Sequence, residues 1–286
     1  MKRHTLLRMA PLFLLLGIAP ETAFPQSAAR PAAPQLAHTN SAVLLETLSW
    51  DEAEGVLTPD AVVVIALGAE SKEHGRHLQL NNDFLMAEYL KNRVLAAAPQ
   101  NVVVAPTINY SFYPAFLEYP GSTSLSLDTS RAVFTNIVHS LAHYGPRRFY
   151  ILNTGISTLH PLAEAAAELA KDGILLRYTD LTQDDPVEKK VRQSGGSHAD
   201  EIETSMMLYI APESVRMNKA ARDLSPDKPG PLTRDAHGKG TYSPTGAWGD
   251  PTLATREKGQ AVTESLVATI LKNIDDLRQT PLAPAK

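Results

Sequence analysis

A histidine-containing segment with flanking carboxylates is the part of this sequence best equipped for chemistry. It runs from Lys72 to Leu78, includes His74, and is followed by Asp83. It comes directly after residues 61–68, an apolar and β-branched run typical of a buried strand. Imidazole nitrogens and carboxylate oxygens are the usual protein ligands of zinc and manganese, and open α/β sheets bind ligands where strands end. The segment is therefore a candidate metal site; the alternative is a polar loop that caps a helix with Asp83.

An extended chain after this strand would sort its polar side chains by face. Since side chains alternate along an extended backbone, Glu70, Lys72 and His74 would share one face and Glu73 would point away. Asp83, at the start of the next helix, would reach back to the same point. A solvated turn is an equally good interpretation of Glu73.

A second polar segment follows another predicted strand. Residues 153–158 read Asn-Thr-Gly-Ile-Ser-Thr, and backbone N–H groups at such a helix start can hold an anion or a carbonyl oxygen. The alternative is an ordinary helix cap formed by Ser157 or Thr158.

A third polar segment, residues 197–205, opens a predicted helix. Ser197 and Asp200 are spaced as in a capping box, and His198 lies one turn before Glu201. A histidine beside a carboxylate at a helix start is a plausible proton shuttle. The alternative is a surface histidine with no catalytic role.

The elements that must position these residues alternate between strand-like and helix-like patterns. This alternation predicts right-handed crossovers and a mostly parallel sheet with helices on both faces, an α/β fold in a single domain. A polar surface excursion is expected at 182–197 and a Pro- and Gly-rich loop at 224–249. Strands are predicted at 62–67, 102–105, 149–152 and 174–178, and helices from Asn82 or Asp83 to 98, Asp128 to Gly145, Ser157 or Thr158 to 172, 198–210 and 253–277.

The N-terminus has the pattern of a secretory signal peptide. Lys2, Arg3 and Arg8 precede an apolar stretch too short to span a bilayer, and small residues follow. We predict a signal peptide at 1–28, a flexible mature N-terminus at 29–42, and one domain at 43–280. The protein is thus expected to be exported, to the periplasm in a bacterium, and not to remain in the membrane after processing.

Composition narrows the partners and the kinds of site. The chain of 286 residues carries a formal charge of −4, and it is more acidic without its basic N-terminus. This charge argues against nucleic acid or an anionic membrane as a partner. There is no cysteine, so a metal site must use nitrogen and oxygen ligands.

Several landmarks occur in the order seen in the creatininase (creatinine amidohydrolase) family, and the sequence resembles that family from Glu46 to the last predicted helix. The landmarks are 67–69 (Leu-Gly-Ala), 73–78 (Glu-His-Gly-Arg-His-Leu), Asp83, 119–123 (Tyr-Pro-Gly-Ser-Thr), 198–208 with Glu203-Thr204-Ser205, 240–242, and 249–259.

The resemblance implies a compact α/β fold, often assembled as a hexamer, with a two-metal site of zinc or manganese. There a metal-held hydroxide attacks a carbonyl group. By the motifs, His74 and Asp83 correspond to metal ligands and Asp83 to the bridging one. His198 corresponds to the proton-transferring histidine, and Glu203 to the carboxylate of the Glu-Thr-Ser segment.

The chain departs from the family pattern at ligand positions. Lys72 replaces the first metal-ligand glutamate, so that an ammonium could stand where a cation would. Gly155 replaces a metal-binding histidine, and Ser157 replaces an acidic ligand of some members. Two or three ligands are therefore missing by type.

Two functions of different kinds follow. The first is an exported amidohydrolase that keeps one zinc or manganese ion on Glu70, His74 and Asp83 and acts on a small cyclic amide or a related C–N bond. Whether Glu70 or Glu73 replaces the missing ligand stays open. The second is a member that has lost the metal and binds a small ligand or a protein partner without hydrolysis, with Lys72 and His198 as polar anchors.

Overall fold

The computed structural model describes residues 42–98 and 101–282. The signal peptide and most of the flexible N-terminus predicted above lie outside these ranges. Among the described residues, no helix combines the length and the apolar character needed to cross a membrane.

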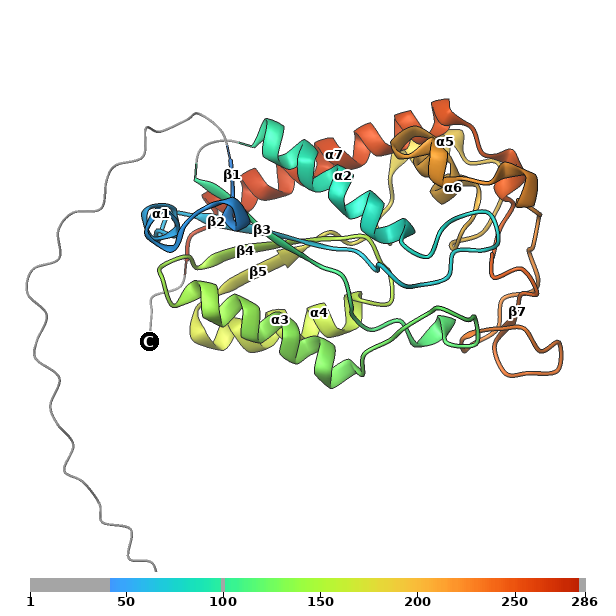
Figure 1. The fold of residues 1–286 in the computed structure, drawn as a ribbon, viewed down its shortest axis with the longest axis horizontal. Helices are drawn as coiled ribbons and strands as arrows, with labels where there is room; N and C mark the ends of the chain where they lie inside the picture. Colours follow the sequence, from blue (N-terminus) through green and yellow to red (C-terminus); the bar gives the residue numbers. More distant parts are fainter. Residues whose placement is uncertain (1–41, 99–100, 283–286) are drawn as a thin grey trace, which may run out of the picture. The chain divides into compact units, whose positions relative to one another are not determined.

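A five-stranded parallel sheet forms the centre of the domain (Figure 1), as the alternating pattern predicted. The strand order is β1-β3-β2-β4-β5, so β2 lies in the middle between β3 and β4. The strands are β1 (Val43–Leu44), β2 (Val62–Leu67), β3 (Val102–Ile108), β4 (Arg148–Asn153) and β5 (Leu175–Tyr178).

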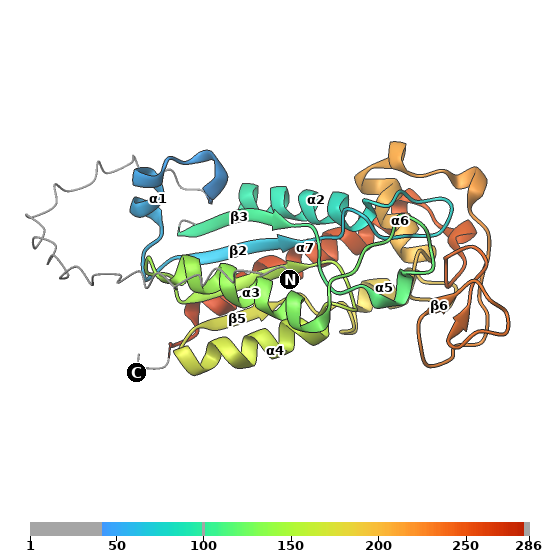
Figure 2. The same ribbon diagram turned by 60° about the horizontal axis from the view of Figure 1, so that its bottom comes forward.

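Helices cover both faces of the sheet. One face carries α2 and α7 and the other carries α3 and α4 (Figures 1 and 2). The helices are α1 (Trp50–Val56), α2 (Asn82–Ala97), α3 (Leu127–Ala142), α4 (Leu159–Leu169), α5 (Pro186–Val191), α6 (Glu201–Ile210) and α7 (Arg256–Gln279).

Strand β2 shows why the sheet needs both layers. Val62 and Val64 face the core under α2 and α7, whereas Val63 and Ile65 face the core under α3 and α4. All six residues of β2 are buried, so its apolar run is continuous rather than alternating. The sheet edge at the carboxyl end of β2 is where the polar segments begin.

The starts of α3 and α6 differ from the sequence-based predictions. The N-cap of α3 is Ser126, whose side chain accepts from the Thr129 amide, so Asp128 lies inside the first turn. The N-cap of α6 is Asp200, which accepts from the amides of Ile202 and Glu203. His198 therefore precedes α6 and is not part of it. In both cases a side chain that reaches the free amides of the first turn sets the start.

The two irregular segments are built into the domain. Residues 182–197, expected to be a surface excursion, contain α5, which packs on α7. Residues 224–249 contain the short strands β6 (Leu232–Thr233) and β7 (Thr241–Tyr242). The end of this second segment pairs with the residues before α6 through an antiparallel bridge between His198 and Trp248.

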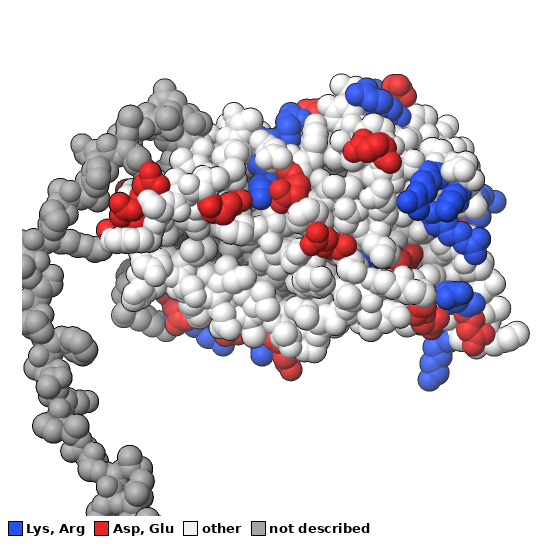
Figure 3. Space-filling view, viewed as in Figure 1, with Lys and Arg blue, Asp and Glu red and all other residues white. Residues whose placement is uncertain are grey.

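Charged side chains are unevenly spread over the face shown in Figure 3. Lys and Arg gather at the end that carries α6 and β7, while Asp and Glu are scattered over the whole face, including that end. From the net charge we predicted that nucleic acid is not a partner, and this stays a prediction.

Candidate active site

A close approach between β2 and α2 brings Asp83 to the end of the central strand. Gly68 follows β2 directly, and a Cβ at this position would overlap the backbone carbonyl of Asp83 and the side chain of Ala87. Thr154, after β4, donates from Oγ1 to the carbonyl oxygens of Leu67 at 3.0 Å and of Asp83 at 3.3 Å. Glycine is thus required here so that the first turn of α2 can lie against the strand end.

His74 is completely buried and contacts an acceptor with each ring nitrogen. Its Nδ1 lies 2.9 Å from the carbonyl oxygen of Lys72 and its Nε2 lies 2.7 Å from Oδ1 of Asp83. Because both partners are acceptors, both nitrogens carry hydrogens in this state. Burial acts to lower the pKa of His74, but the carboxylates of Asp83 and Glu203 together outweigh it and raise that pKa above its ordinary value.

Lys72 forms a buried ion pair with Asp83. Its Nζ lies 2.7 Å from Oδ2 of Asp83, and both side chains are almost fully buried. Burial acts to raise the pKa of Asp83, but His74 and Lys72 outweigh it and hold that pKa well below its usual range. The ammonium therefore lies beside the carboxylate that the family resemblance assigned to bridging two ions.

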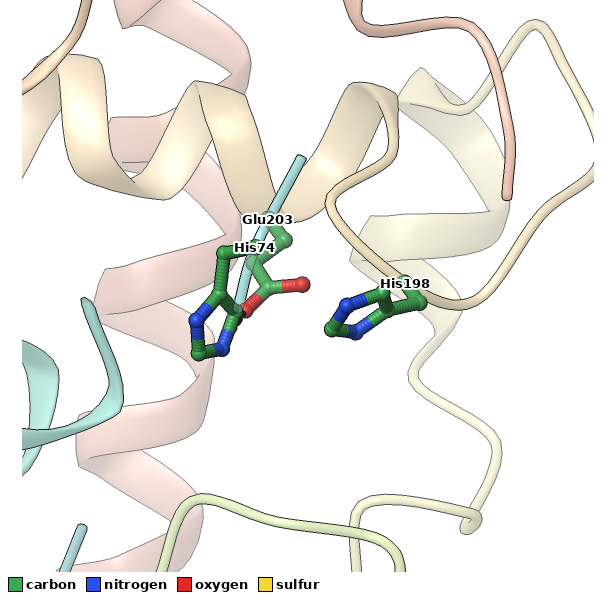
Figure 4. Close-up of side chains that lie close together, drawn as sticks. All are labelled: His74, His198 and Glu203. Carbon is green, nitrogen blue, oxygen red and sulfur yellow. Dashed lines mark ion pairs between the residues drawn. The ribbon is translucent and has the colours of Figure 1, made fainter. Parts of the chain in front are cut away.

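Glu203 joins this cluster from the first turn of α6. Its Oε1 accepts from Nδ2 of Asn82 at 2.8 Å and lies 3.4 Å from Nε2 of His74. Its Oε2 accepts from the amide of Ala199 at 2.7 Å. The carboxylate lies between the rings of His74 and His198 (Figure 4).

His198 pairs with Glu73 rather than with an acid of its own helix. Its Nε2 lies 2.8 Å from Oε1 of Glu73, while Oε2 of Glu73 accepts from the amide of Gly75 at 2.9 Å. Burial acts to raise the pKa of Glu73, but the His198 charge and hydrogen bond, with smaller contributions, lower it. An ionised carboxylate only accepts, so His198 carries a hydrogen on Nε2.

The 224–249 segment holds this pair in place. The amide of Trp248 donates to the carbonyl oxygen of His198 at 2.8 Å, and the carbonyl oxygen of Trp248 accepts from the amide of Ser197. Gly246, with φ of +85°, packs on Glu73, since a Cβ there would overlap the Glu73 carboxylate. Only glycine suits both the backbone conformation and the contact.

A cavity of about 890 Å³ opens onto these groups. Its walls include Lys72, Phe116, His198 and Glu203, together with residues of the 182–185 segment and of α5 and α7. The aromatic ring of Phe116 lies 4.4 Å from the ring of His198, between centroids. The cavity is large for a ligand of a few heavy atoms and within the range of ordinary small-molecule sites.

Three side chains of metal-ligand type lie close together: His74, His198 and Glu203 have candidate ligand atoms within 4.8 Å of one another.

A sequence model of a protein family, described as creatinine amidohydrolase, matches residues 46–274. The chain belongs to the creatininase family. The sequence-based family prediction is thereby confirmed.

Curated relatives and solved structures agree with this assignment. The chain is 27% identical over 257 residues to creatinine amidohydrolase of Pseudomonas putida, covering 81% of this chain and 95% of the relative. It is 26% identical over 231 residues to mycofactocin precursor peptide peptidase of Mycobacterium ulcerans, covering 77% and 86%. A mutant creatininase complexed with creatine superposes with a TM-score of 0.67 at 22% identity, covering 83% and 99% of the two chains. The structural likeness shows the creatininase fold, and solved creatininases include manganese and zinc forms.

Within this family framework, the structure brings together His74, Asp83, His198 and Glu203, but not Glu70. The side chain of Glu70 is exposed and accepts from Nδ2 of Asn109 at 2.6 Å. The reason is that β2 ends at Leu67 and the chain turns, so the alternation assumed for an extended 68–74 segment does not apply.

Glu73 is the site residue that the extended-chain argument misplaced. It is 5% exposed and holds the ring of His198, whereas Glu201 instead binds Lys258 and the amides of Gln193 and Ser194. The one signal in the sequence was an acidic residue next to His74, and that signal did not distinguish a buried partner from a solvated turn.

Proposed function

We propose that this member of the creatininase family is a metal-dependent amidohydrolase that acts on a small cyclic amide or a related C–N bond. The observation that carries the proposal is the cluster of His74, His198 and Glu203, two of which, His198 and Glu203, line the cavity. Imidazole and carboxylate are a donor set suited to zinc or manganese. The names of both curated relatives describe cleavage of a bond between a carbonyl carbon and nitrogen.

His74, Glu203 and Asp83 are the residues that would hold one divalent ion. Nε2 of His74 faces a carboxylate oxygen from each of the other two, so the ring offers a ligand there once its proton leaves. Its other nitrogen is held by the Lys72 carbonyl oxygen, the kind of contact that orients metal-binding histidines. A bound ion supplies an activated water and polarises a carbonyl oxygen.

His198 transfers the proton in this proposal. Glu73 holds Nε2–H, so Nδ1 accepts the proton that the attacking water loses and returns it to the leaving nitrogen. The aromatic side of Phe116 covers the ring and limits its contact with solvent. This arrangement gives His198 a role separate from the three residues that bind the ion.

The test is ring opening of hydantoins, lactams and creatinine by zinc- or manganese-loaded protein. His198→Ala should lower turnover by about 10²–10⁴ and leave the metal bound, since a proton shuttle contributes about that factor. His139→Ala is the matched control, because His139 is an exposed histidine beside Asp172, away from the cavity. Full activity of His198→Ala would contradict the role of this residue.

Metal content gives a second, independent measurement. His74→Ala should lose bound metal by orders of magnitude in affinity, while wild type should hold one ion per chain. Equal metal in both proteins would overturn the proposed ligand set. If no metal-dependent ring opening occurs while small amides raise the melting temperature, the ligand-binding alternative is the better account.

A further inference from the structure

Lys72 is a buried cation at a place where the family resemblance led us to expect a metal-binding carboxylate. Its side chain is 6% exposed, and its Nζ pairs with Oδ2 of Asp83 at 2.7 Å. A buried ammonium is costly unless it is paired, so the contact with Asp83 fixes its position.

The ammonium has donors left for a ligand. It carries three N–H groups, and among the described residues it pairs with one carboxylate, that of Asp83. Its other neighbours are aromatic faces: the ring centroids of Phe116 and Tyr113 lie 4.8 Å and 5.4 Å from Nζ. Aromatic faces attract a cation without occupying its donors in strong hydrogen bonds. Lys72 also lines the cavity, with His198 and Glu203.

We propose that Lys72 replaces a second metal ion, as a fixed cation that neutralises Asp83 and binds the carbonyl oxygen of the scissile amide. This inference rests on the proposed amidohydrolase function. When water adds to the carbonyl carbon, the C=O electron pair moves to oxygen, and the ammonium donates a hydrogen bond to that oxyanion. The water proton passes to His198. The electron pair then returns, the C–N bond breaks, and His198 protonates the leaving nitrogen.

This role has a consequence that a purely structural lysine would not have. Removing the positive charge of Lys72 should strengthen binding of a divalent cation, since like charges repel and the Asp83 carboxylate no longer shares its charge with the ammonium. The same removal should weaken turnover, since the oxyanion loses a donor. A lysine needed only for folding would lower both quantities together.

The experiment compares Lys72→Met with Lys91→Met. Lys91 is also buried, at 6% exposed, and pairs with Glu88 at 3.0 Å on α2, outside the cavity lining. Zinc affinity is measured by competition with a chromogenic chelator, and the fold is checked by circular dichroism. In Lys72→Met we expect zinc binding on the order of tenfold tighter, and kcat about 10²–10³ lower with little change in KM. Lys91→Met should leave the zinc affinity unchanged.

Lys72→Arg keeps the inference testable if the methionine variant does not fold. It retains the charge but moves the donors into a planar fork, so zinc affinity should stay within about threefold of wild type while kcat falls. Unchanged or weaker zinc binding in folded Lys72→Met would overturn the inference. If wild type hydrolyses none of the amides, the proposed function fails, but the zinc measurement still decides whether Lys72 takes the place of a cation.

Discussion

The turns that follow β2 and β4 occupy neighbouring places at the same sheet edge, yet they are built from opposite kinds of chemistry. After β2, the buried side chains of Lys72, His74 and Asp83 form a chain of charged contacts. After β4, Asn153 closes a neutral turn: its Oδ1 accepts from the Gly155 amide and from Oγ1 of Thr158.

The neutral turn satisfies its own polar groups. Nδ2 of Asn153 donates to the carbonyl oxygens of Gly155 at 2.7 Å and of Thr179 at 3.2 Å. The amide of Gly155, expected from the sequence to be available for an anion or a carbonyl oxygen, is therefore already used. The comparison supports the proposed binding of one ion rather than two, because residues 153–158 offer no histidine or carboxylate at this sheet edge.

The largest expected effect comes from removing the shared carboxylate of the charged turn. Asp83→Ala leaves the buried ammonium of Lys72 without its partner, so we expect a loss of about 3–5 kcal/mol in the free energy of unfolding. Asn153→Ala, the matched variant in the neutral turn, should lose about 1–3 kcal/mol. Urea unfolding with a chelator present measures both without a contribution from bound metal. Equal losses would show that the two turns do not differ as described.

A double variant sharpens the same test. Lys72→Met combined with Asp83→Ala removes both charges and should recover part of the loss seen in Asp83→Ala alone. No recovery would mean that Asp83 stabilises the protein through contacts other than the ion pair.

The next largest effect is a pH dependence of the free energy of unfolding, which we expect only from the charged turn after β2. His77 is 1% exposed, and its Nε2 contacts Oγ1 of Thr204 at 2.8 Å. Burial, followed by the positive charges of His74 and His198, lowers the pKa of His77 to about 4. Between that value and the ordinary 6.5, the unfolded chain binds a proton that the folded protein does not. The free energy of unfolding should therefore rise with pH over this range, by up to about 3 kcal/mol.

Urea unfolding of the chelator-treated protein at pH 4.5, 5.5 and 6.5 measures this slope. His77→Gln should flatten it, and Asn153→Ala should leave it intact. Above pH 6.5 the sign reverses for His74, whose raised pKa means that its stabilisation is lost as pH increases through the folded value. A slope unaffected by His77→Gln would show that other groups cause the acid sensitivity.

The fold was predictable because its signals are local. The continuous apolar run of β2 and the helical periodicity of α2 are written in neighbouring residues, and the parallel sheet follows from their alternation. The errors lie at helix starts such as that of α3, where two polar residues two positions apart, Ser126 and Asp128, both suit a cap. Which of them reaches the free amides depends on the direction of the incoming chain.

The sequence indicated which residues form the site, but not which side chain contacts which. His74, Asp83, His198 and Glu203 stood out through motifs, and the structure brings them together. The partner of His198 did not stand out, because Glu73 is 125 positions away and is held there by the 224–249 segment. Such a contact depends on how the chain turns after β2, which no local periodicity records.

The variant with the smallest expected effect on stability tests whether the neutral turn after β4 can be made to bind the ion. Ser157 is half-buried, lines the same cavity as Lys72, and replaces an acidic ligand by resemblance to the family. Ser157→Glu should change the free energy of unfolding by no more than about 0.5 kcal/mol, since no buried contact of this side chain is lost. A new carboxylate beside the ion should nevertheless tighten zinc binding by about tenfold, because it adds an anionic ligand of the preferred type. Zinc competition measures this, with Ser157→Gln as the uncharged control of the same size. Unchanged affinity in Ser157→Glu would mean that the turn after β4 does not reach the ion. The two turns would then differ in their position relative to the ion as well as in their chemistry.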